Sequence, residues 1–122
     1  MIPESSSFKH ALRSLKPGDT VQMSEAMGDF ILPKDQNIPL VFIAGGIGIT
    51  PFRSMINWLI DSQSRRNIQV IYFAPDKEHI AFTSTLDQSF LNTAFVTDGS
   101  KLTVDELNKR VTDIKDKYLY VS

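Results

Sequence analysis

The sequence predicts an α/β fold built on a doubly wound parallel sheet, and three observations support this. Residues 39–44 and 68–74 are two almost continuously apolar runs, which is typical of strands covered on both faces. Between them, residues 52–62 carry apolar side chains at helical spacing. Strands that alternate with helices favour a parallel sheet with right-handed crossovers.

The first third of the chain is expected to be β-structured instead. Lys16-Pro17-Gly18-Asp19 is a turn signal, and residues 20–23 alternate in polarity like a half-buried strand. Residues 28–33 form a glycine turn followed by a short apolar piece that ends at proline. The polar stretch 34–37 is typical of a linker. We therefore place a domain boundary there, with residues 1–36 in one unit and residues 37–122 in the next.

Later segments complete the expected α/β unit. A weaker helix is predicted over residues 82–90 and a third strand over residues 93–97. The sequence Thr103-Val104-Asp105-Glu106 is a capping box that opens a helix reaching about residue 112. A fourth strand is predicted over residues 118–121. Because the chain stops at the end of this strand, we expect the unit to be truncated at its C-terminus.

Composition excludes several classes of function. The 122 residues carry a net charge of −1, so there is no basic field for nucleic acid. The absence of cysteine excludes disulfides, thiolate metal sites and a cysteine nucleophile. His10 and His79 are far apart in the sequence and have no carboxylate or cysteine at metal-ligand spacing, so surface roles are expected for them rather than a metal site. No signal peptide or membrane-spanning run is visible, which indicates a soluble, cytoplasmic chain, although a longer parent could carry a membrane segment.

A glycine-rich turn joins the first buried strand to the first helix. Gly45, Gly46 and Gly48 let the backbone approach an anion, and the following helix N-terminus offers unpaired N–H groups and positive partial charge. Thr50 is the expected N-cap, and Pro51 suits the first helical position. A P-loop would end in Gly-Lys-Ser/Thr, and the common dinucleotide fingerprint would have glycine in place of Pro51.

Residues 45–55, Gly-Gly-Ile-Gly-Ile-Thr-Pro-Phe-Arg-Ser-Met, resemble the NAD(P)-binding motif of the ferredoxin–NADP reductase superfamily. Residues 7–33 look like the closing part of the flavin-binding β-barrel in that family, and residues 118–122 are similar to the strand that precedes a Gly-Pro pair. The resemblance implies that residues 1–36 are a remnant of the antiparallel barrel. The family's Arg-x-Tyr-Ser/Thr stretch and Gly-Pro pair are absent, so the chain is expected to bind FAD weakly or not at all.

The resemblance implies an FAD-dependent NAD(P)H oxidoreductase, with hydride transfer to the flavin and electron transfer to an acceptor such as an iron–sulfur protein or another electron carrier. Thr50 and Ser122 are the candidate catalytic residues beside the nicotinamide, although Ser122 could equally have no role. The residues expected to bind the nucleotide are Gly45, Gly46, Ile47, Gly48, Ile49, Thr50 and Pro51. Ser6, Ser7 and Lys9 are the candidate flavin contacts, and a solvated polar terminus is the alternative.

Nucleotide preference depends on the end of the second strand. NADPH-using members often carry arginine where Pro75 stands, whereas Asp76 would repel a 2′-phosphate and accept a hydrogen bond from a 2′-hydroxyl. This favours NADH slightly, because a plain Pro-Asp turn and a phosphate contact from Lys77 are alternatives.

Two further points stay open in the sequence. Arg65 and Arg66 are expected to cap the first helix, with docking of an acidic electron carrier as the alternative. The rival function is a non-catalytic nucleotide-binding or regulatory module.

Overall fold

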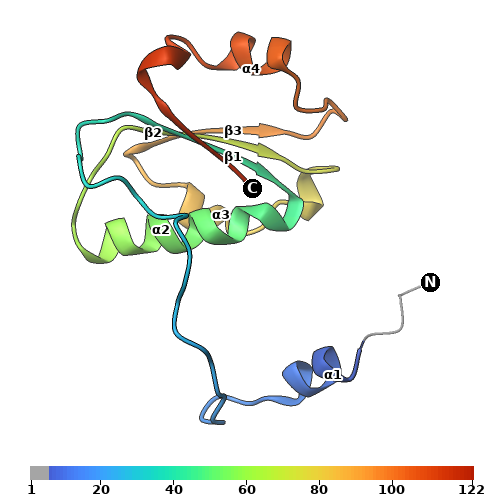
Figure 1. Ribbon diagram of the computed structural model, residues 1–122. Coiled ribbons are helices and arrows are strands. Elements are labelled where there is room, and N and C mark those ends of the chain that lie inside the picture. Colours follow the sequence, from blue (N-terminus) through green and yellow to red (C-terminus); the bar gives the residue numbers. More distant parts are fainter. Residues whose placement is uncertain (1–5) are drawn as a thin grey trace.

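The computed structural model describes residues 6–122 and contains one four-stranded parallel sheet (Figure 1). The strand order is β3-β2-β1-β4, so β1 lies in the interior and pairs with both β2 and β4. The strands are β1 Leu40–Gly45, β2 Ile68–Phe73, β3 Leu91–Val96 and β4 Tyr118–Val121. The predicted parallel α/β fold is confirmed, because every pairing in this sheet is parallel.

Helices cover both faces of the sheet. Helices α2 (Ile49–Asp61) and α3 (Thr83–Leu86) lie on one face, and α4 (Val104–Arg110) lies on the other (Figure 1). Short 3-10 turns connect these elements at Gly46–Gly48, Lys77–His79 and Ile114–Asp116. The arrangement places the β1–α2 turn at the edge where all four parallel strands end.

The sheet separates two hydrophobic cores. On the α2 face, Phe42 of β1 stacks on Phe52 of α2 with ring centroids 4.5 Å apart, and both side chains are fully buried. On the α4 face, Val41 and Ile43 pack in a smaller cluster with Val111. Successive residues of β1 therefore serve opposite cores, which explains why the whole strand is apolar.

Two predicted helices, α3 and α4, are shorter in the structure. Helix α4 ends at Arg110 instead of near residue 112. Helix α3 covers only Thr83–Leu86, because residues 87–90 turn into β3, which begins at Leu91. The capping box is confirmed in part: the Thr103 hydroxyl accepts from the Glu106 N–H at 3.1 Å. The Glu106 carboxylate pairs with Arg110 at 2.6 Å, one helical turn later.

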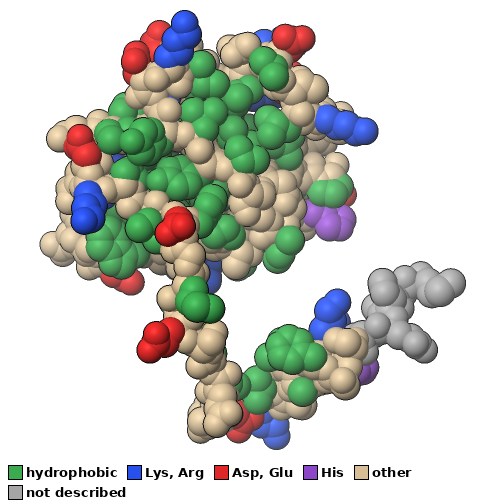
Figure 2. Space-filling model, in the orientation of Figure 1, with side chains coloured by type: hydrophobic (Ala, Val, Ile, Leu, Met, Phe, Trp, Pro, Cys, Tyr) green, Lys and Arg blue, Asp and Glu red, His purple; other side chains and the backbone are tan. Residues whose placement is uncertain are grey.

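The strand predicted at residues 20–23 is wrong. In the described chain, residues 6–39 contain helix α1 (Ser7–Ser14) and no strand. A strand requires a neighbour that accepts its backbone hydrogen bonds, and residues 20–23 are exposed with no strand beside them. Hydrophobic side chains are correspondingly exposed along this segment (Figure 2). The division at residue 36 stays a prediction, and residues 1–5 of that unit lie outside the described residues.

The end of β4 fixes the shape of the glycine turn. The Ser122 N–H donates to the Ile43 carbonyl, and the Gly45 N–H donates to the Ser122 carbonyl, both at 2.9 Å. A Cβ atom on Gly48 would overlap the Ser122 backbone carbonyl. Gly48 is therefore required by close approach of two backbones, rather than by its own dihedral angles.

We expect Phe52→Ala to lower the free energy of unfolding by about 3–5 kcal/mol, because it removes a buried ring and leaves a cavity beneath Phe42. Urea denaturation followed by circular dichroism measures the change. Phe8→Ala is the matched control, since Phe8 is 69% exposed on α1, and it should change the free energy by less than about 0.5 kcal/mol. Equal effects of the two substitutions would contradict the assignment of the core.

We expect Gly48→Ala to lower the free energy of unfolding by about 1–3 kcal/mol, because the added methyl group displaces the end of β4. Gly45→Ala is the control, because no heavy atom beyond its chain neighbours lies within 4 Å of the added Cβ atom. Urea denaturation of both variants makes the comparison. A stability of Gly48→Ala equal to that of the unsubstituted chain would show that the Gly48–Ser122 contact is not tight in solution.

Candidate functional site

The glycine turn lies at the carboxyl edge of the sheet, where ligands bind in open α/β folds. β1 ends at Gly45, the 3-10 turn covers Gly46–Gly48, and α2 follows directly at Ile49. Gly46 has φ +53°, a left-handed conformation that glycine adopts without strain. Gly48 is the N-cap of α2 and supplies no side-chain acceptor, and the Ile49 N–H already donates to the Gly46 and Ile47 carbonyls. The positive end of the helix dipole is therefore the feature of this terminus that favours an anion.

The expected capping role of Thr50 is wrong. The helix begins at Ile49, two residues earlier than predicted, because the 3-10 turn runs into it without interruption. The Thr50 hydroxyl donates to the Ile47 carbonyl at 2.7 Å and so braces the turn. Pro51 lies within the first helical turn rather than at its first position, where its missing N–H still costs no intrahelical hydrogen bond.

The outer surface of the turn is open. A Cβ atom added to Gly45 or Gly46 would meet no heavy atom within 4 Å beyond their chain neighbours, and Ile47 is 84% exposed. The backbone can therefore be approached closely, as an anionic group requires. An accessible glycine backbone beside the positive end of a helix dipole fits an anionic group such as a pyrophosphate.

A cavity of about 340 Å³ adjoins the turn, between the ends of β1, β2 and β4 and the loop that follows β3. Lys101 of that loop and Ser122 both line it, so the structure brings a cation beside the predicted residue Ser122. Sequence reasoning missed Lys101 because it lies in no motif. The available signal was its place after the third strand, since parallel strands end at one common edge.

Asp76 lies at the same edge, three residues beyond β2. Its Oδ1 atom accepts from the N–H groups of Glu78 at 2.9 Å and His79 at 3.1 Å, and lies 2.8 Å from His79 Nδ1. The hydrogen bond with the His79 side chain is the main reason that the pKa of the Asp76 carboxyl lies below its ordinary value. The carboxylate caps a 3-10 turn, which matches the plain Pro-Asp turn, and the hydrogen bonds recorded in residues 6–122 engage only Oδ1.

The candidate flavin contacts lie elsewhere. Ser6 caps α1, where its hydroxyl accepts from the Lys9 N–H at 3.4 Å. Ser6, Ser7 and Lys9 are exposed, and α1 stands apart from the sheet (Figure 1). The structure does not bring these three residues to the glycine turn.

Two features are absent from the part of the chain that the structure describes. Across residues 6–122, no group of three or more His, Cys, Asp or Glu side chains is placed to hold a metal ion. Within the same range, no helix has the length and apolar character needed to cross a membrane.

Comparison with known sequences identifies relatives of this region. The oxidoreductase NAD-binding domain family model matches residues 42–112, more than half of the chain. The flavohemoprotein of Bacillus cereus is 42% identical over 72 residues, covering 54% of this chain and 18% of the relative. Reductase component 1 of the terephthalate 1,2-dioxygenase of a Comamonas species is 29% identical over 112 residues, covering 87% of this chain and 33% of the relative. The chain thus spans a third or less of these relatives.

Solved structures share the fold. The ferredoxin-NADP+ reductase of Plasmodium falciparum has a TM-score of 0.73 at 23% identity, covering 95% of this chain and 53% of that one. The flavohemoglobin of Malassezia yamatoensis has a TM-score of 0.61 at 16% identity, covering 99% of this chain and 42% of that one. These matches and the family model confirm the resemblance drawn from the glycine turn. The chain belongs to the oxidoreductase NAD-binding domain family, with the fold found in ferredoxin reductases.

Proposed function

We propose that this chain binds the pyridine nucleotide of an FAD-dependent NAD(P)H oxidoreductase of the ferredoxin reductase type. The enzyme transfers hydride from the nucleotide to FAD and passes electrons to an acceptor such as an iron–sulfur protein. The observation that carries the proposal is the open glycine backbone at the N-terminus of α2, inside the region that matches the family. The names of the relatives support it, since they include flavohemoproteins and the reductase component of a dioxygenase.

The residues of the turn account for nucleotide binding. Gly45 and Gly46 leave room for the pyrophosphate, and the positive end of the α2 dipole attracts its oxygens. Lys101 adds positive charge at the same edge, which favours phosphate electrostatically. The bound nucleotide supplies the hydride, and the flavin accepts it.

Thr50 and Ser122 are proposed to position the nicotinamide. Thr50 uses its hydroxyl proton on the Ile47 carbonyl, so its oxygen faces a ligand as an acceptor. Ser122 is held by β4 pairing at the rim of the 340 Å³ cavity, directly beside Gly45. Both residues are thus fixed by backbone contacts before any ligand arrives, which lowers the entropic cost of ordering the site.

We expect the chain to bind NADH, and Gly45→Ala to weaken that binding about tenfold or more, because the methyl group occupies the space open to the phosphates. Isothermal titration calorimetry measures the dissociation constant, and Asn108→Ala on exposed α4 is the control. Equal affinity of Gly45→Ala and the unsubstituted chain would place the nucleotide elsewhere.

NADH-dependent dye reduction by a version extended at both ends, with FAD, tests the catalytic part of the proposal. Reduction of the dye supports the oxidoreductase. NADH binding without flavin binding or dye reduction would instead establish the rival function, a non-catalytic nucleotide-binding or regulatory module.

We further propose that Asp76 favours NADH over NADPH through its negative charge. Asp76→Asn keeps an oxygen that can cap the 3-10 turn, so the expected effect is electrostatic. NADPH affinity should rise about threefold to tenfold relative to NADH, and more at low salt, because the site is exposed and screened.

The pH dependence has a defined sign. Because the pKa of Asp76 is lowered, the carboxylate stays ionised as pH falls through the ordinary aspartate range at about 4, and the preference for NADH persists there. It is lost only below that range. Fluorescence titration with each nucleotide measures the ratio, with exposed Asp61→Asn as the control. A ratio that is unchanged in Asp76→Asn would contradict the proposal.

A further inference from the structure

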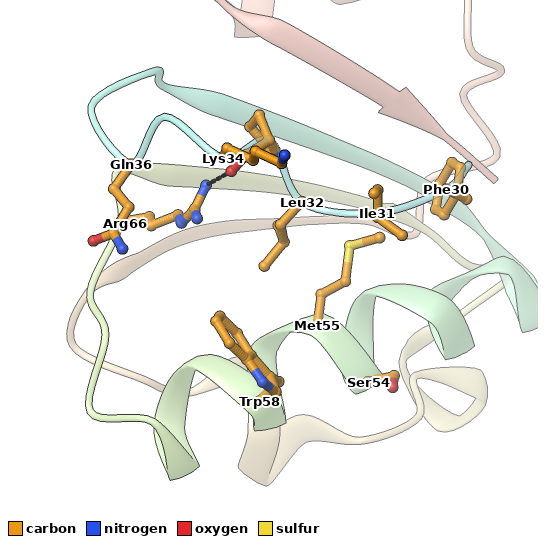
Figure 3. Close-up of a pocket in the computed structure, with 10 residues that line it drawn as sticks. Phe30, Ile31, Leu32, Lys34, Gln36, Ser54, Met55, Trp58 and Arg66 are labelled. Carbon is orange, nitrogen blue, oxygen red and sulfur yellow. Dashed lines mark hydrogen bonds between the residues drawn. The ribbon is translucent and has the colours of Figure 1, made fainter. Parts of the chain in front are cut away.

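Residues 30–36, here called the strap, run alongside α2 and form one wall of a cavity of about 540 Å³, with Met55 and Trp58 of α2 opposite (Figure 3). We propose that Tyr120 and Arg66 are positioning residues that clamp the two ends of the strap to the nucleotide-binding unit. The clamp fixes the direction in which the preceding chain leaves that unit.

Tyr120 of β4 holds the first end. Its hydroxyl donates to the Ile31 carbonyl at 2.8 Å, across 89 positions of sequence. The Phe30 ring packs edge-on against Tyr120 at 5.3 Å between centroids and tilted against Phe52 at 5.6 Å. Burial raises the pKa of the Tyr120 hydroxyl, so the group remains a donor at neutral and moderately alkaline pH.

Arg66, just before β2, holds the second end. Its side chain is buried, with the residue 7% exposed, and Nη1 donates to the Pro33 carbonyl at 2.8 Å and the Asp35 carbonyl at 3.4 Å. Arg66 therefore serves the strap, and its expected role as a cap of α2 is wrong. A buried guanidinium is costly without acceptors, and its Nε atom has no hydrogen-bond partner in the described chain. The strap carbonyls are the recorded acceptors, so strap and guanidinium depend on each other.

Leu32 packs against the main core between these two points. The strap is thus held at three places within a few residues, while the chain before Phe30 runs away from the sheet towards α1 (Figure 1). The contacts with Tyr120 therefore set the direction of the chain that precedes Phe30.

The consequence for the enzyme rests on the proposed function. The candidate flavin contacts precede the strap, and the nucleotide binds after it. The clamp then sets how the flavin side approaches the carboxyl edge of the sheet, and hydride transfer depends steeply on that geometry.

Spin labels on Asp29→Cys and Lys109→Cys test the clamp, because both sites are exposed and the chain has no native cysteine. Pulsed electron–electron double resonance measures the distribution of distances between the two spin labels. We expect a narrow distribution in the labelled parent and a broad one in Tyr120→Phe/Arg66→Met. Each lost hydrogen bond shifts the opening equilibrium of the strap about fivefold.

Tyr118→Phe/Arg65→Met is the matched control, because both residues are exposed neighbours of the clamp residues on the same segments. It should keep the narrow distribution, and Arg66→Lys should restore part of it in the Tyr120→Phe background. Equal widths in the clamp and control variants overturn the proposal. If circular dichroism shows that the Arg66→Met variant does not fold, Tyr120→Phe alone against Tyr118→Phe decides.

NADH titration of the same samples separates the two proposals. The clamp variants should bind NADH with the same affinity as the labelled parent, because the strap lies off the glycine turn. A clamp variant with weaker NADH affinity would show that Tyr120 and Arg66 also support nucleotide binding, and would overturn their assignment as positioning residues alone. A labelled parent that fails to bind NADH defeats the proposed function, whereas the strap result depends only on the distances.

Discussion

The pairing of β1 with both β2 and β4 is the constraint on which the rest of the structure depends. β1 is buried along its length except at Gly45, and its side chains alternate between the two cores. This double pairing fixes where the strand ends, and the end of the strand is the beginning of the glycine turn. The Phe42–Phe52 stack then fixes α2 over the same strand. The position of the helix N-terminus therefore follows from the core rather than from the turn itself.

The glycine turn is shaped from two directions. On one side the Thr50 hydroxyl ties α2 back to Ile47, and on the other the Ser122 backbone approaches Gly48 so closely that no side chain fits. Glycine therefore suits these three positions for different physical reasons. Gly48 allows contact with β4, whereas Gly45 and Gly46 face open space and leave the backbone accessible. The proposed phosphate site is the place where this open backbone meets the positive end of a helix.

The N-terminal segment is organised on another principle. Its described residues form no strand, its hydrophobic side chains are largely exposed, and its hydrogen bonds to the sheet unit are those of the strap with Tyr120 and Arg66. The nucleotide-binding unit carries its own core, while the segment before it makes α1 and an extended chain. In the proposed enzyme the flavin side is joined to the nucleotide side through a few specific contacts, so the geometry between cofactors depends on those contacts and not on the sheet.

The sequence by itself determined the elements whose signals are local. Continuous apolar runs specified β1 and β2, the Thr103 capping box specified α4, and glycines between a buried strand and an amphipathic helix specified the turn. Tertiary structure decided what depends on distant partners. Residues 20–23 have a strand pattern and no neighbour to pair with, and Arg66 reaches carbonyls more than thirty residues earlier in the chain. Lys101 meets the site only because parallel strands end at one edge. Periodicity records which face of an element is covered, whereas the identity of the covering partner is set by the assembled fold.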